Sequence, residues 1–161
     1  MKFNSISRNI TLNKKAKSPK TNLKISRNAA PITENTISVS LQFLSKNKLR
    51  NFDFFSKSDF RQKAHALDQF LDFIKRLTSK TRLEISSLSK NDDCGFEEIP
   101  FAQINCNPDR KTLAKDAKIC VFRFGNNGSG GDYRLLGIFD SGFPVLNIIG
   151  FDFNYSAYDH E

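Results

Sequence analysis

The stretch Lys118–Glu161 decides the fold, and it reads KICVFRFGNNGSGGDYRLLGIFDSGFPVLNIIGFDFNYSAYDHE. Its first part, Lys118–Phe124, alternates between two sets of side chains, which is the period of a half-buried strand. The loop Gly125–Asp132 is rich enough in glycine to turn the chain, and Tyr133–Phe139 then predicts a second strand. These segments predict an antiparallel hairpin.

A third strand is predicted at Phe143–Phe153, after a tight turn. Both of its faces are apolar, so we expect it inside the sheet. Strict alternation assigns its side chains to one face (Val145, Ile149 and Phe151) or to the other (Leu146 and Ile148).

Two arginines occupy matching places in the predicted hairpin. Arg123 and Arg134 lie equally far from the centre of the loop, so a symmetric hairpin makes them cross-strand partners on one face. Like charges directly opposite each other are unfavourable, and an anion bound between the two guanidinium groups removes the conflict. The pair therefore predicts an anion-binding site.

The end of the chain is dense in hydrogen-bonding and titratable groups: Asp152, Asn154, Tyr155, Tyr158, Asp159 and His160. Two interpretations stay open for it. The tail either returns beside the arginine pair or is a solvated chain end.

These residues resemble the C-terminal half of RelE-type toxins, which belong to the RelE/ParE superfamily of bacterial toxin–antitoxin systems. The resemblance rests on short motifs: Arg123 in VFRFG, Asp132, Tyr133 and Arg134 in GDYRLLG, and Tyr158 and His160 in AYDHE. The C-terminal half also resembles small uncharacterised proteins found beside mobile genetic elements.

The resemblance implies an endoribonuclease that cuts messenger RNA at the ribosome without a metal or another cofactor. Its partners would be mRNA, the ribosome and a cognate antitoxin, either protein or RNA. The implied catalytic set is Arg123, Arg134, Tyr158 and His160, in which the arginines stabilise the phosphate and His160 transfers a proton. The implied substrate-binding residues are Tyr133, Asp152 and Tyr155.

Two other functions remain open. The same fold can act as a non-catalytic module that inhibits or regulates a protein target, as the ParE branch does with DNA gyrase. The sheet of a phage or plasmid protein can also simply bind a partner.

The segments before the hairpin predict a strand and two helices. Thr36–Leu44 alternates like a strand with one buried face. A helix is expected from about Ser58 to Leu77, preceded by a capping box of Ser56 and Asp59. A second, shorter helix is expected at Leu83–Leu88, where the capping pair is Thr81 and Glu84.

Between the helices and the hairpin, Phe96–Ile104 predicts an edge strand, because Pro100 has no backbone N–H to donate to a neighbouring strand. Leu113–Lys115 predicts a single helical turn. The fold class is therefore α+β, with an antiparallel sheet of four to five strands and two helices packed on one face, as in RelE. Residues 36–161 are expected to form one domain.

The formal net charge of +8 is carried by the N-terminal segment. Residues 1–33 contain eight basic residues and no acidic one, which leaves 17 basic residues against all 17 acidic ones. Residues 1–35 are therefore predicted to be a disordered basic arm, which either binds RNA or serves as a solubilising leader.

Three cysteines without C-x-x-C spacing and two histidines indicate neither a disulfide framework nor a zinc site. No segment has the apolar length of a membrane span, so no membrane partner and a cytoplasmic location are expected.

Overall fold

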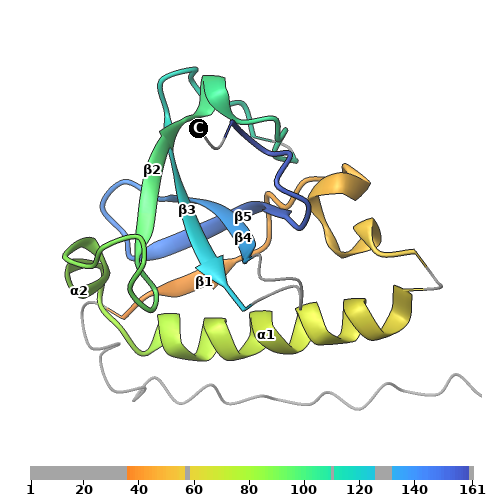
Figure 1. The fold of residues 1–161 in the computed structure, drawn as a ribbon. Helices are drawn as coiled ribbons and strands as arrows, with labels where there is room; N and C mark the ends of the chain where they lie inside the picture. The colour runs from red at the N-terminus through yellow and green to blue at the C-terminus, as the bar shows by residue number, and fades with distance from the viewer. Residues whose placement is uncertain (1–35, 57–58, 110, 126–131, 160–161) are drawn as a thin grey trace, which may run out of the picture.

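The computed structural model describes residues 36–56, 59–109, 111–125 and 132–159. The predicted arm at residues 1–35, most of the glycine-rich loop and His160 lie outside these ranges. The described part is an α+β fold in which a long helix, α1, lies along one side of a five-stranded sheet (Figure 1). The chain end and the segment after β2 lie on the opposite side.

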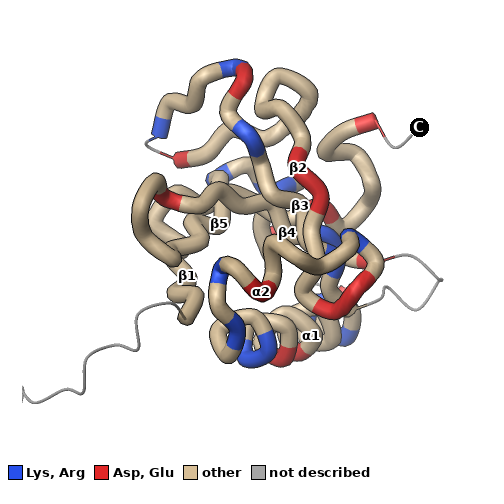
Figure 2. Tube along the Cα trace, turned by 90° about the vertical axis from the view of Figure 1, so that its left-hand side faces the viewer, with Lys and Arg blue, Asp and Glu red and all other residues tan. Residues whose placement is uncertain are grey.

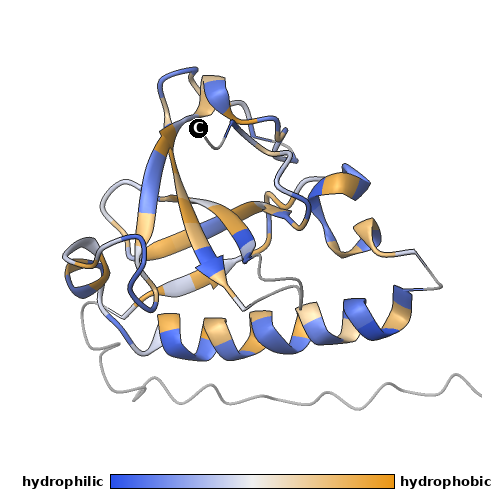
Figure 3. Ribbon diagram, in the orientation of Figure 1, coloured by the Kyte–Doolittle hydropathy of each residue, from blue (hydrophilic) through white to orange (hydrophobic). Residues whose placement is uncertain are grey.

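The strands are β1 (Ser38–Ser40), β2 (Phe96–Pro100), β3 (Lys118–Phe124), β4 (Tyr133–Phe139) and β5 (Val145–Asp152), in the spatial order β1-β5-β4-β3-β2. As predicted, β5 lies inside the sheet and β2 is an edge strand. Figure 3 shows that β3 is mostly hydrophobic, whereas β2 is mostly hydrophilic, as suits an edge.

The prediction of an antiparallel sheet is wrong at β1, which pairs with β5 in parallel, so the sheet is mixed. Side-chain alternation has the same period in both directions, and the sequence pattern could not separate them. The strand is also shorter than predicted. The chain turns after Ser40, which leaves Leu41 exposed and lets Ser45 donate its backbone N–H to the Ile149 carbonyl at 2.9 Å.

The hairpin of β3 and β4 has the predicted register, with Arg123 opposite Arg134. The predicted faces of β5 need one correction, because Ile149 is an extra residue in its ladder with β4. This β-bulge shifts the alternation, so Phe151 shares a face with Leu146 and Ile148 and not with Ile149.

Helix α1 (Phe60–Thr78) buries Ala66, Phe70, Phe73 and Leu77 against the sheet. Its predicted capping box is absent. The Ser56 hydroxyl donates to the Asp59 carboxylate at 2.6 Å, and Asp59, the N-cap, makes no side-chain capping bond. Helix α2 (Arg82–Ser86) does have the predicted capping box of Thr81 and Glu84. Its Ile85 joins the same core.

Among the described residues, the opposite face of the sheet is covered by no α-helix, although the 3₁₀ helix η4 (Phe101–Gln103) contributes Phe101 to it. Ile119, Val121, Leu136 and Ile149 pack there beneath Ile104, Cys106 and Ala157, which come from the segment after β2 and from the tail. Leu113–Lys115 is not helical, although the sequence predicted a turn of helix. This second face carries the polar groups described next.

Candidate functional site

The site is built on the arginine pair, on the face opposite α1. The Arg134 side chain comes from β4 and is only 8% exposed. Its Nε and Nη1 atoms are buried and have no hydrogen-bond partner among the described residues, and the same is true of the Arg123 Nε. A buried N–H group without a partner costs about 1–3 kcal/mol. Within the part of the chain that the structure describes, the pair therefore keeps unsatisfied donors beside each other.

The tail covers one side of Arg134 with an aromatic ring. The Arg134 Cζ lies 4.2 Å from the Tyr155 ring centre and 6.0 Å from that of Tyr158. Tyr155 has a φ of 59°, a left-handed conformation that is unfavourable for a residue with a Cβ. The backbone is strained where the chain lays this ring on the guanidinium group.

A pocket of about 290 Å³ opens beside the pair. Its lining is mostly polar: Lys90, Glu97, Ile99, Gln103, Arg123, Arg134, Tyr158 and Asp159. Glu97, from β2, accepts a hydrogen bond from the Tyr158 hydroxyl at 2.9 Å and one from Lys90 Nζ at 3.2 Å. On the far side of the pair, Arg123 Nη1 donates to Asn91 Oδ1 at 2.9 Å.

The ionisation of the pocket follows from these contacts. Burial raises the pKa of Glu97, but hydrogen bonds from Tyr158 and Lys90 and the charges of Lys90 and Arg123 outweigh it, so the net pKa is lowered. The pKa of Tyr158 is raised by burial and by its bond to the Glu97 carboxylate. At neutral pH Glu97 is therefore a carboxylate and Tyr158 a neutral phenol that donates a hydrogen bond.

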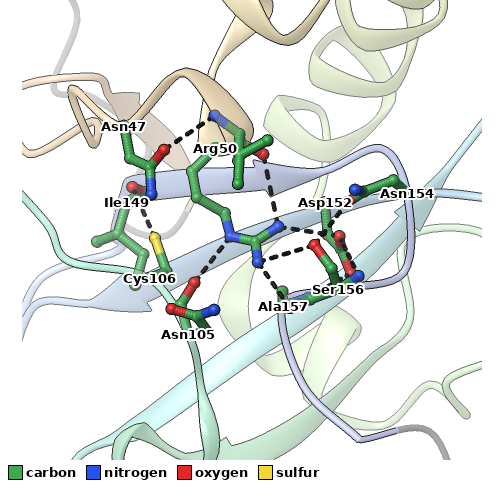
Figure 4. Close-up of polar contacts among 10 residues, drawn as sticks. Asn47, Arg50, Asn105, Cys106, Ile149, Asp152, Asn154, Ser156 and Ala157 are labelled. Carbon is green, nitrogen blue, oxygen red and sulfur yellow. Dashed lines mark hydrogen bonds and ion pairs between the residues drawn. The ribbon is translucent and has the colours of Figure 1, made fainter.

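A second buried arginine holds the tail in place. Arg50 is 1% exposed and follows β1 in the 3₁₀ turn η1 (Lys48–Arg50). Figure 4 shows its guanidinium group ringed by acceptors: Asp152 Oδ1 at 3.1 Å, the Asn105 carbonyl at 2.8 Å and the Ser156 carbonyl at 2.7 Å.

Asp152 completes this network. Its carboxylate also accepts the backbone N–H groups of Ser156 at 3.0 Å and Ala157 at 3.2 Å, which bends the tail back over the sheet. Gly150 makes room for the contact, because a Cβ there would lie 2.7 Å from Cys106 Sγ and 3.3 Å from Arg50 Cβ. Arg50 and Asp152 thus position the segment that carries Tyr155 and Tyr158.

The structure brings together most of the residues predicted for the site. Arg123, Arg134 and Tyr158 line one pocket, and Tyr155 packs on Arg134. Asp152 is the cross-strand neighbour of Arg134 but lies fully buried in the Arg50 network. Tyr133 lies away from them, on the α1 face among phenylalanines, and burial raises its pKa. His160 lies outside the described residues.

Sequence reasoning missed Arg50, Lys90 and Glu97. Arg50 stands in Lys46–Phe55, an irregular connection in which the sequence indicated only that the phenylalanines pack on the core. Glu97 could have been found, because β2 was expected to be an edge strand beside the hairpin. Side chains alternate along a strand, and Phe96 faces the α1 core, so Glu97 faces the side that carries the arginine pair.

Other kinds of site are not found in the part of the chain that the structure describes. No group of three or more His, Cys, Asp or Glu side chains there could hold a metal ion. Burial is the largest cause that raises the cysteine pKa values, to about 11 for Cys94 and Cys106 and to about 12 for Cys120. These thiols are protonated at neutral pH and are poor nucleophiles. Within the same ranges, no helix is long and apolar enough to cross a membrane.

Comparisons with protein-family models, with curated proteins and with solved structures find no match to this chain.

Proposed function

We propose that the pocket beside Arg123 and Arg134 binds a phosphate group of an RNA chain. The observation that carries this proposal is the buried Arg134 guanidinium, whose Nε and Nη1 donors have no hydrogen-bond partner among the described residues. Phosphate oxygens are strong acceptors and pair well with the planar fork of a guanidinium group. A bound phosphate also offsets the repulsion between the two cross-strand arginines.

We further propose that the protein cleaves the bound RNA as a metal-independent endoribonuclease. Glu97 takes the proton of a ribose 2′-OH, and the 2′ oxygen then bonds to phosphorus as the bond from phosphorus to the 5′ oxygen breaks. The two arginines stabilise the charge that develops on the phosphate. His160, predicted from sequence, protonates the leaving 5′ oxygen. The products are a 2′,3′-cyclic phosphate and a 5′-hydroxyl end.

The biological setting in this proposal follows from the resemblance to RelE-type toxins. The protein would be the toxin of a toxin–antitoxin pair, neutralised by an antitoxin protein or RNA and acting on mRNA at the ribosome in the cytoplasm. The eight basic residues among positions 1–33 support an RNA partner, because each neutralised phosphate adds a salt-dependent increment to affinity.

A second candidate is a binding module without chemistry. It is favoured by the contacts of Glu97, whose two carboxylate oxygens already accept bonds from Tyr158 and Lys90. A carboxylate held in this way also serves simply as a wall of the pocket. The arginine pair would then hold an acidic group of a protein target.

Purified protein incubated with single-stranded RNA and a chelator tests both candidates. Binding and cleavage are measured for the wild type, for Arg134→Met and for Glu97→Gln, with Lys118→Ala as the control. Lys118 is an exposed cation of the same strand as Arg123 and pairs with Glu98 instead of lining this pocket.

If the endoribonuclease proposal holds, Arg134→Met weakens both binding and cleavage, Glu97→Gln abolishes cleavage alone, and Lys118→Ala changes neither. Binding without cleavage by the wild type supports the module. RNA binding that Arg134→Met leaves unchanged refutes the phosphate site. Inducible expression in a bacterium, with growth and transcript integrity followed together, then tests the toxin role.

A further inference from the structure

Helix α1 carries exposed apolar side chains that the fold does not use. Phe60 is 73% exposed, Leu67 43% and Leu71 50%, and Ala64 between them is exposed as well. The spacings of four, three and four residues place Phe60, Ala64, Leu67 and Leu71 on one line of the helix surface. We call these four residues the apolar stripe. It is separate from the residues that α1 buries against the sheet.

Two charges of opposite sign flank the stripe at equivalent places. Arg61 follows Phe60, and Asp68 follows Leu67 seven residues later. Neighbouring charges of α1 form ion pairs within the chain, namely Lys63 with Asp53, Lys75 with Asp72 and Arg76 with Asp93. Among the described residues, Arg61 and Asp68 take part in no such pair. Figure 2, which views α1 nearly along its axis, shows both acidic and basic residues on the helix.

The stripe is complementary to itself when two copies of α1 run antiparallel. Phe60 then lies opposite Leu71 of the second copy, and Ala64 lies opposite Leu67 of the second copy, so each layer pairs a larger with a smaller side chain. Arg61 comes beside Asp68 of the second copy, and the twofold axis repeats this pair. A parallel arrangement would place the two copies of each residue on opposite sides of the contact, so it would not bring Arg61 beside Asp68 of the second copy.

We propose that the apolar stripe is the interface of a homodimer in which two α1 helices pack antiparallel. The partner is a second copy because Arg61 of each copy meets Asp68 of the other across the twofold axis. The surface of an unrelated protein is not constrained to match these two charges. The arginine pocket lies on the other face of the sheet. Dimerisation therefore leaves both pockets open, and it does not depend on the proposed RNA function.

Sedimentation velocity of the full chain, from about 1 μM to about 1 mM, measures the association. The wild type should form a dimer in this range. Leu67→Asp should keep the chain monomeric at every concentration, because it places a carboxylate in the centre of the apolar contact. Leu83→Asp is the matched control. Leu83 is 82% exposed on α2, outside the stripe, and its substitution should leave the dimer unchanged.

A charge swap tests the antiparallel geometry. Arg61→Asp and Asp68→Arg should each weaken the dimer at least about tenfold, because each places like charges together across the axis. The double variant restores opposite charges and should return to within about threefold of the wild type. Urea unfolding confirms that each variant is folded.

Three results would overturn the proposal. The wild type stays monomeric throughout the range, or its dimer persists in Leu67→Asp, or the double variant dimerises no better than the single ones. The first result would leave the stripe to a different protein, and the other two would place the dimer contact elsewhere.

Discussion

Two buried arginines on the same face of the sheet have opposite surroundings. Arg50 is 1% exposed, and its guanidinium group donates to the Asp152 carboxylate and to the carbonyls of Asn105 and Ser156. Arg134 is 8% exposed, and its Nε and Nη1 atoms have no hydrogen-bond partner in the described part of the chain. Asp152 lies next to both, since it bonds to Arg50 and is the cross-strand neighbour of Arg134.

Arg50, whose donors are used within the fold, has a structural role, whereas Arg134 keeps donors that a ligand could use. A buried ion pair whose remaining donors and acceptors are satisfied holds segments together, and here it ties the tail to η1 and to the segment after β2. A buried cation with unused donors lowers stability until an acceptor arrives. The tail held by Arg50 carries Tyr155, whose ring lies on Arg134, so the first arginine positions the surroundings of the second.

The largest effect is expected from breaking the structural arginine. Arg50→Met should lower the free energy of unfolding by about 3–5 kcal/mol, because it leaves the Asp152 carboxylate buried without its cation. Urea denaturation measures the loss. The double variant with Asp152→Leu should recover much of it, since it removes the unpaired charge as well. A loss below about 1 kcal/mol in the single variant would contradict the role given to Arg50.

The same substitution at Arg134 should act on RNA cleavage and not on the stability of the fold. Arg134→Met should not lower the free energy of unfolding, because it removes buried donors that have no partner among the described residues together with the charge. In the RNA assay it should slow cleavage roughly a hundredfold, which corresponds to about 3 kcal/mol of lost transition-state stabilisation. A variant that unfolds as readily as Arg50→Met would show that the two arginines do not differ in kind.

Glu97 links the pocket to pH. Its folded-state pKa lies below the ordinary value of 4.5, so its contribution to stability is present above pH 4.5 and is lost as the pH falls through the lowered pKa. The wild type should therefore exceed Glu97→Gln in free energy of unfolding at pH 7, and the difference should shrink on acidification. Equal differences at pH 7 and pH 3 would contradict this. Glu98→Gln on the other face of β2 is the control.

The smallest effect is expected at the ring that covers Arg134. Tyr155→Asn removes a cation–π contact worth about 0.5–1 kcal/mol but keeps a residue that tolerates the left-handed backbone. Tyr155→Ala loses the contact and keeps the strain, so it should be the less stable of the two in urea denaturation. If the asparagine variant is no more stable than the alanine variant, strain at Tyr155 is negligible.

Several features could be predicted because they depend on neighbours in the chain. The register that pairs Arg123 with Arg134 follows from alternation on both sides of a glycine-rich loop. Most of α1 follows from apolar residues at helical spacing, and the edge position of β2 agrees with the restriction imposed by Pro100. The arginine pair itself, the centre of the candidate site, could therefore be found in the sequence before any tertiary contact was known.

Other features were decided only when distant segments met. The parallel direction of β1 and the bulge at Ile149 depend on how β5 lies between β1 and β4, and no local pattern encodes that arrangement. Arg50 is buried only because Asp152, Asn105 and Ser156 surround it with acceptors from 102, 55 and 106 residues away. The burial of a charge and the partners it finds depend on the complete tertiary structure, and these are the properties in which Arg50 differs from Arg134.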